Sequence, residues 1–151
     1  MVSHGQVFFV VAGHRCIRVE NYHESYEPTP PGGPVFFGIR GIASTMAWQG
    51  TDGRWFVKPS RRAERVPPDV EIFGLIERGD SEPEAHLAAI DASRTTIGCF
   101  ARSAFHPIHQ SAARIAVAAT SSAARHLAYL TESGELVILS YDTGAELVRL
   151  T

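Results

Sequence analysis

A unit of about forty residues recurs along this chain of 151 residues. Self-similarity at such a period is the signature of a repeat architecture, in which each unit is one small structural module. Four turn signals between β-rich runs contain Gly13, Gly53, Ser93 and Gly134, at successive intervals of 40, 40 and 41 residues. Glycine supplies the positive φ that a tight hairpin needs, so we expect a hairpin at each of these positions. A β-branched residue follows four positions beyond each turn: Ile17, Val57, Ile97 and Ile138.

Each unit is predicted to be a small antiparallel sheet of four strands. The last unit, 114–151, contains four short apolar runs separated by polar turns. We place the earlier units at 35–69 and 70–113, and a partial unit at 1–34 that enters the pattern at its second strand. An alanine recurs on the strand before the turn, at Ala47, Ala88 and Ala128. The sequence therefore predicts a single all-β domain over 1–151, with about three and a half repeats.

Small residues mark another strand of the repeat, at Gly38, Gly74 and Ala118. We expect this strand to be the innermost of its unit, where neighbouring units crowd together. Two windows, 83–90 and 121–130, also have the spacing of short amphipathic helices. They leave an α+β fold as the alternative, and the repeat argues against it.

Segments rich in proline, glycine and charge lie between the units, at 26–34, 58–69 and 105–113. This composition is typical of exposed connections. We expect each segment to be a surface loop that joins one unit to the first strand of the next. The fourth strands of the earlier units have no clear apolar run of their own.

The final unit resembles a WD repeat over residues 126–150. In that family a polar hairpin ending in glycine precedes a strand, and Ser133 and Gly134 occupy that place. A Thr-Gly turn then leads to the outermost strand, and Thr143 and Gly144 match it. The order of these features corresponds to the second, third and fourth strands of the repeat.

The chain also departs from the WD pattern. Leu139 and Ser140 replace the Trp-Asp pair, and the one Gly-His pair, Gly13 and His14, lies in a hairpin. The resemblance, clearest over 114–151, implies a divergent bacterial β-propeller of four-stranded blades. It also implies a platform for protein–protein interaction without catalytic residues.

A propeller closes with four to eight blades, because an open fan leaves sheet faces exposed. Three and a half blades suggest a half-propeller that a second copy completes as a homodimer. Closure of one chain as a four-bladed ring and completion by another protein remain as alternatives. We expect a scaffold in a bacterial signalling or defence assembly.

Composition excludes several other classes of protein. The net charge of −2 and the pI of about 6.4 give no global field that attracts nucleic acid or an anionic membrane. No apolar run approaches the ~20 residues of a membrane span, and no basic segment precedes the first apolar run. We expect a cytoplasmic protein. Cys16 and Cys99 are expected to be buried thiols, since their spacing forms neither a disulfide framework nor a zinc motif.

Two groups of residues are candidates for chemistry other than protein binding. His106 and His109, with Cys99 upstream, have a spacing that suits part of a metal site or a Cys-His nucleophile of a hydrolase. A polar loop explains the two histidines more simply. We therefore expect no enzyme, catalytic residue, metal or cofactor.

Charged and aromatic surface residues complete the set of candidates. A basic run at 58–65 is the basis of an alternative function, a nucleic-acid-binding module, and it contains Lys58, Arg61, Arg62 and Arg65. Tyr22 and Tyr26 lie in an acidic segment that suits a basic partner surface. An exposed loop is the preferred interpretation of both segments, and nucleic acid is not the expected partner.

Overall fold

All regular elements of the described chain are β-strands. The computed structural model describes residues 7–12, 15–20, 23–26, 31–40, 43–58, 62–78, 84–121 and 125–151. The prediction of an all-β fold is confirmed. The two windows with a helical pattern contain β9 (Glu84–Ile90) and β13 (His126–Thr131). In β13 buried residues alternate with more exposed ones, which is the two-residue period of a strand, so the α+β alternative is wrong.

The strands form four antiparallel sheets, and each sheet follows the order of its strands in the chain. The first sheet contains β1 (Val7–Ala12), β2 (Arg15–Glu20) and β3 (His23–Tyr26). The second contains β4 (Pro31–Arg40), β5 (Ala43–Gly50), β6 (Trp55–Lys58) and β7 (Arg62–Glu64). The third contains β8 (Glu71–Arg78), β9, β10 (Thr96–Ala101) and β11 (Ala104–Gln110). The fourth contains β12 (Ile115–Ser121), β13, β14 (Leu136–Ser140) and β15 (Glu146–Leu150).

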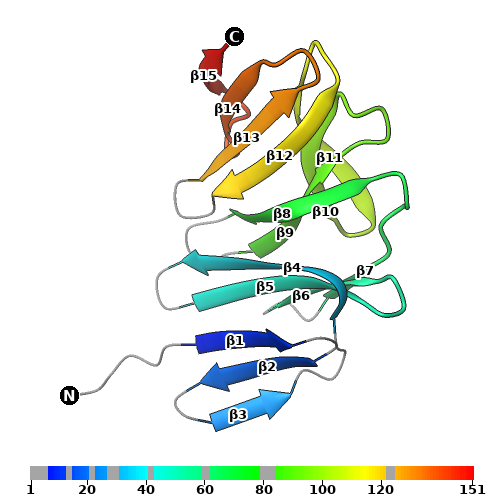
Figure 1. Ribbon diagram of the computed structural model, residues 1–151, viewed down its shortest axis with the longest axis vertical. Coiled ribbons are helices and arrows are strands. Elements are labelled where there is room, and N and C mark those ends of the chain that lie inside the picture. Colours follow the sequence, from blue (N-terminus) through cyan, green and yellow to red (C-terminus); the bar gives the residue numbers. More distant parts are fainter. Residues whose placement is uncertain are drawn as a thin grey trace, which may run out of the picture.

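The sheets are stacked in chain order along the long axis of the molecule (Figure 1). The first strand of the third sheet, β8, contacts β4 on one side and β12 on the other. The first and fourth sheets lie at opposite ends of the stack (Figure 1). The described part of one chain is therefore an open stack, without a ring closed on itself.

Gly74 allows two of these first strands to approach closely. A Cβ at this position of β8 would lie 2.5 Å from the hydroxyl oxygen of Thr120 in β12 and 2.8 Å from its methyl group. Thr120 is β-branched, and its side chain has little freedom to move away. The sequence-based expectation of crowding at Gly74 is thus confirmed.

One hairpin turn recurs in each of the second, third and fourth sheets. Gly53 (φ 82°) and Gly134 (φ 92°) have the positive φ expected of them. Each ends a turn in which its N–H donates to the carbonyl three residues earlier, at 3.0 Å. In the third sheet the equivalent residue is Arg94 (φ 59°), whose N–H donates to Asp91 O at 2.9 Å. The prediction of Ser93 at this position was wrong by one residue.

The third hairpin is also one residue longer than the other two. Asp91 N bonds to Thr96 O, five residues on, whereas the hairpins at Gly53 and Gly134 close across four residues. Cys99 therefore pairs with Ala88, as Val57 pairs with Ala47 and Ile138 with Ala128. Cys99, and not the predicted Ile97, is the third-sheet counterpart of Val57 and Ile138.

Apolar side chains fill the space between successive sheets. One core cluster lies between the second and third sheets and contains Ala47, Trp55, Val57, Ile72, Leu75, Ala85, Leu87, Ala89 and Phe100. Another lies between the third and fourth sheets and contains Ile76, Ala88, Ile90, Ile97, Cys99, Ile115, Leu127, Tyr129, Val137, Leu139 and Tyr141. Trp55, two residues after Gly53 of the hairpin, packs between the second and third sheets.

Four segments expected to be loops contain strand residues, and in 26–34 these are the first residues of β4. The other three contain the last strand of a sheet. The acidic segment with Tyr26 forms β3, the segment 58–69 contains β7, and the segment 105–113 contains β11. Each of these is the last strand of its sheet and has one free edge. An edge strand tolerates charge and proline, because half of its backbone groups need no partner strand. Because polar residues are also typical of loops, the composition of these segments did not indicate strands.

Two buried carboxylates join the second sheet to the third. Glu64 at the end of β7 accepts hydrogen bonds from Arg102 N at 2.8 Å and Ser103 N at 2.9 Å. These two residues form the tight β10–β11 turn, and both have positive φ, as a type I′ turn requires. The hydroxyl of Thr45 in β5 donates to the carboxylate of Glu77 in β8, and Glu77 is fully buried.

Candidate interaction surface

Each inner sheet presents one face to the sheet that follows it in the chain, and we call this the forward face. In the third sheet Ala88 and Cys99 are cross-strand partners on the forward face, and so are Ile90 and Ile97. All four are fully buried or nearly so. Side chains of paired residues point to the same side of a sheet, so a forward face is a continuous surface across strands.

The fourth sheet has the same forward face, and no further sheet of the described chain covers it. Cross-strand pairing connects Ala128 to Ile138 and Ile138 to Val148. A second row connects Leu130 to Leu136 and Leu136 to Leu150. The forward face of the fourth sheet therefore has an apolar part that consists of Val117, Ala119, Ala128, Leu130, Leu136, Ile138, Val148 and Leu150. A row of Ser121, His126 and Ser140 continues the face at one end.

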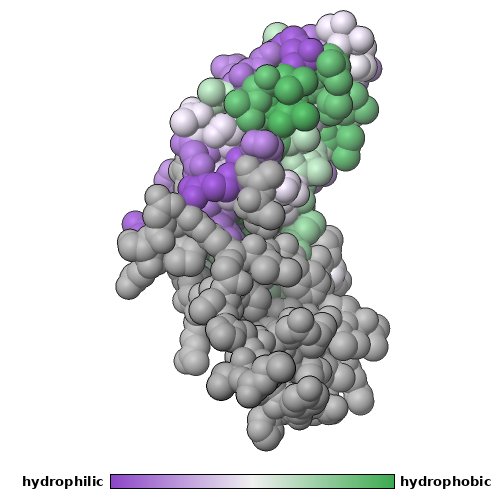
Figure 2. Space-filling view, turned by 90° about the vertical axis from the view of Figure 1, so that its left-hand side faces the viewer, coloured by the Kyte–Doolittle hydropathy of each residue, from purple (hydrophilic) through white to green (hydrophobic). Residues whose placement is uncertain are grey.

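Exposure separates this face from the equivalent face of the third sheet. Leu130 is 37% exposed, whereas its counterpart in the repeat, Ile90, is fully buried. Val117, Val148 and Leu150 are exposed by 54%, 40% and 56%. Figure 2 shows hydrophobic surface gathered in the upper part of the molecule, where Figure 1 places the fourth sheet. A contiguous exposed apolar surface of this kind marks an interaction site.

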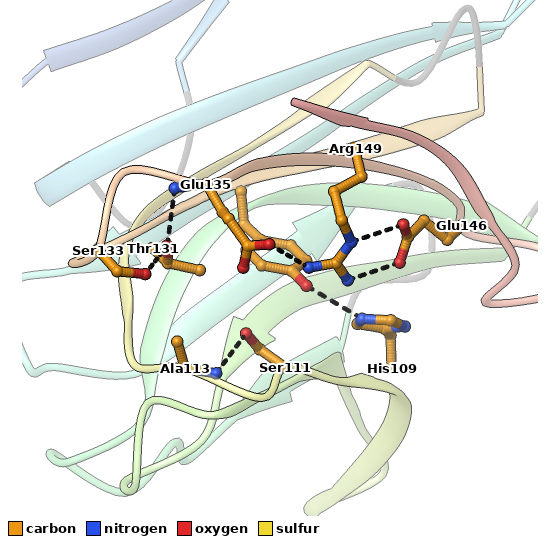
Figure 3. A network of polar contacts seen from close by, with 9 residues as sticks. His109, Ser111, Ala113, Thr131, Ser133, Glu135, Glu146 and Arg149 are labelled. Carbon is orange, nitrogen blue, oxygen red and sulfur yellow. Dashed lines mark hydrogen bonds and ion pairs between the residues drawn. The ribbon is translucent and has the colours of Figure 1, made fainter. Parts of the chain in front are cut away.

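The opposite face of the fourth sheet is covered by the third sheet, and a polar network follows its outer edge (Figure 3). His109 of β11 lies 3.1 Å from the hydroxyl of Tyr129 in β13. Arg149 of β15 donates to both carboxylate oxygens of Glu146, at 2.8 and 2.7 Å, and to Glu135 at 2.7 Å. The hydrogen bonds from Arg149 lower the pKa of Glu146. Ion pairs thus lie along the outer edge of the covered side, while the central rows of the forward face carry only apolar side chains.

The predicted histidine and cysteine group is not assembled. His106 is exposed and its Nε2 lies 3.2 Å from Ala101 O, while His109 contacts Tyr129. The Sγ of Cys99 lies 3.7 Å from Nδ1 of a different histidine, His86. Within the ranges that the structure describes, no three His, Cys, Asp or Glu side chains gather as metal ligands.

The other predicted surface residues are only partly described. Tyr22 and Arg61 lie outside the described residues. Tyr26 ends β3, Lys58 ends β6 and Arg62 begins β7, and Arg65 follows β7 as an exposed residue. Their roles in binding a basic partner or nucleic acid remain predictions. No helix in the described ranges is long and apolar enough to cross a membrane.

The forward face of the fourth sheet was not among the predicted site residues, although the sequence carries a signal for it. Ala128, Leu130, Leu136 and Ile138 are apolar residues one repeat after Ala88, Ile90, Ile97 and Cys99, which face a neighbouring sheet. A last repeat that keeps the apolar pattern of an inner repeat indicates a surface that another sheet covers.

Comparison of the chain with protein-family models, curated proteins and solved structures finds no significant match.

Proposed function

We propose that this chain is a non-enzymatic protein-interaction scaffold, built from WD-like blades of the β-propeller type. Its consecutive four-stranded antiparallel sheets support this proposal, since each follows the order of its strands and stacks on the next. The contacts of β8 with β4 and β12 add support, because the first strand of each blade lies innermost in a propeller.

One observation carries the proposal. The forward face of the fourth sheet has the apolar side chains of a buried surface, yet Val117, Leu130, Val148 and Leu150 are exposed. Hydrophobic side chains at this density favour removal from water, and only another macromolecule covers so broad a face.

The chemistry of this face favours a protein over a small substrate. Its central rows contain only alanine, valine, leucine and isoleucine, and the polar residues Ser121, His126 and Ser140 form a row at one end. A small-molecule site needs a concave surface with a few convergent polar groups. An apolar sheet face with a polar edge instead resembles the core and rim of a protein interface.

Carbene footprinting in intact cells that naturally produce the chain tests this function without knowledge of the partner. We expect Leu130, Leu136 and Val148 to be labelled several-fold less than in the denatured chain. Leu147 provides an internal control, because it is 50% exposed and a register shift between Ile138 and Leu139 leaves it outside the cross-strand rows. Labelling of all four residues to the extent of their exposure in one chain would contradict the proposal.

A further inference from the structure

We infer that the forward face of the fourth sheet is covered by the first sheet of a second copy, so that two copies join head to tail into one closed ring. This inference rests on the proposed function and names the partner of the same surface. It commits to a directional contact, in which the end of one stack meets the beginning of another.

The interior of the chain shows what covers a forward face. Ala88 and Cys99 of the third sheet pack in one cluster with Leu127, Tyr129 and Val137 of the fourth. These three residues belong to the opposite face, which we call the backward face, and it meets the preceding sheet. Each covered forward face within the described chain thus contacts the backward face of the next repeat.

A small residue of a forward face and a large residue of a backward face lie in the core between the third and fourth sheets. The small Ala88 lies on the forward face of the third sheet, and the large Tyr129 lies on the backward face that packs against it. Ala128 repeats the small residue on the forward face of the fourth sheet.

The arrangement of the stack points to a second copy as the source of the backward face. The first sheet, β1–β3, lies at the other end of the same molecule from β12–β15 (Figure 1). Two copies contribute two sets of four sheets, eight in all, and propellers close with four to eight blades. A two-fold axis would then create two identical contacts and leave neither end face open.

Photo-crosslinking tests the direction of the contact. The purified full chain is prepared with benzoylphenylalanine in place of Val148, an edge-strand residue that is 40% exposed, and mixed with an equal amount of ¹⁵N-labelled chain. We expect adducts that join the two isotopes and connect position 148 to residues 7–26. Leu150, which is 56% exposed, offers a second position for the crosslinker.

Three results would overturn the inference. Mixed-isotope adducts from position 148 to residues 115–150 would show forward faces packed on each other. Adducts to residues 7–26 within one isotope only would show a ring closed by a single chain. A chain without adducts would exclude the second copy. If the forward face is still protected in cells, the scaffold function survives each of these results, and only the identity or orientation of the partner changes.

A matched pair of variants keeps the test specific. Leu130→Gln with Leu136→Gln changes two residues of the forward face, whereas Leu147→Gln makes the same chemical change outside its rows. We expect the double variant to fold and to give at least tenfold less adduct than the chain without these substitutions. Leu147→Gln should give the same adduct yield as that chain. Equal adduct yields in both variants would contradict the assignment of the contact to this face.

Discussion

Gly74 of β8 lies against Thr120 of β12, at a distance that leaves no room for a Cβ on the glycine. The two strands are the first of the third and fourth sheets, so this contact sets how closely successive sheets approach. The close stacking of repeats depends on such positions.

The Gly74→Ala substitution is expected to destabilise the fold by about 1–3 kcal/mol, the usual cost of overpacking a core. The added methyl group would lie 2.5 Å from Oγ1 of Thr120. Urea unfolding followed by far-UV circular dichroism measures this change. Thr120→Ala in the same chain removes the two closest atoms and should restore part of the stability. An unchanged midpoint for Gly74→Ala would contradict the close contact.

Glu64→Gln tests the connection between the second and third sheets. The carboxylate accepts two backbone hydrogen bonds from the β10–β11 turn, and a glutamine would place an NH₂ group against one of the donors. We expect a loss of about 1–3 kcal/mol in the free energy of unfolding, because a partly buried backbone donor then has no acceptor. Glu132→Gln is the control, since Glu132 forms an exposed ion pair with Arg114 and should lose less than about 1 kcal/mol. Equal losses in the free energy of unfolding for the two variants would contradict a stabilising role of the hydrogen bonds that Glu64 accepts.

Two residues with positive φ should respond to glycine in opposite directions. Ser103 (φ 61°) is exposed in the β10–β11 turn, and Ser103→Gly should raise the free energy of unfolding by about 0.5–1 kcal/mol through relief of the left-handed conformation. Arg94→Gly relieves the same conformation. It also removes the ion pair with Glu71 and hydrogen bonds to Ile115 O and Ala116 O, both at 2.9 Å.

For Arg94→Gly we therefore expect a net loss of about 1–2 kcal/mol, because hydrogen bonds from a charged donor outweigh the strain. Chemical unfolding of both variants in the same buffer gives the comparison. A stabilised Arg94→Gly variant would mean that these contacts between the third and fourth sheets contribute little.

The turn at Asp91 makes stability depend on acid pH. Burial raises the pKa of Asp91, but hydrogen bonds from Ser93 and from the backbone N–H groups of Thr96 and Thr95 outweigh it, and the pKa is lowered from 3.8. The folded state thus binds this proton less readily than the unfolded state. The resulting stability is present above pH 3.8 and is lost as the pH falls through the lowered value.

Asp91→Asn removes this titrating group. Thermal unfolding between pH 3 and pH 6 should show a shallower loss of stability for Asp91→Asn than for the wild type. Parallel curves for the two chains would contradict a lowered pKa at Asp91.

Much of the fold is predictable because it depends on local pattern. The positive φ at Gly53 and Gly134 follows from the tight hairpin turns. Ala47, Ala88 and Ala128 recur because they have equivalent positions in successive sheets. The position of Arg94 does not follow, because a non-glycine residue in this conformation is held by contacts with Ile115 and Ala116 of the next sheet. The spacing of residues in the sequence does not predict such contacts between sheets.

The candidate surface was harder to predict than the fold. His106 and His109 were candidates because imidazole side chains can bind metals or act in catalysis. The structure places both residues in the edge strand β11. The residues that carry the proposed function, Leu130 and Ile138 among them, have the composition of a core. Their exposure becomes evident only from the stacking of the sheets, since no further sheet of the described chain covers the fourth.

The molar mass of the purified chain in solution tests the completion of the stack most directly. By multi-angle light scattering we predict twice the 16.4 kDa of one chain, with a return to the single-chain mass for Leu130→Gln with Leu136→Gln. A folded wild-type chain that remains at 16.4 kDa at all accessible concentrations would contradict the account.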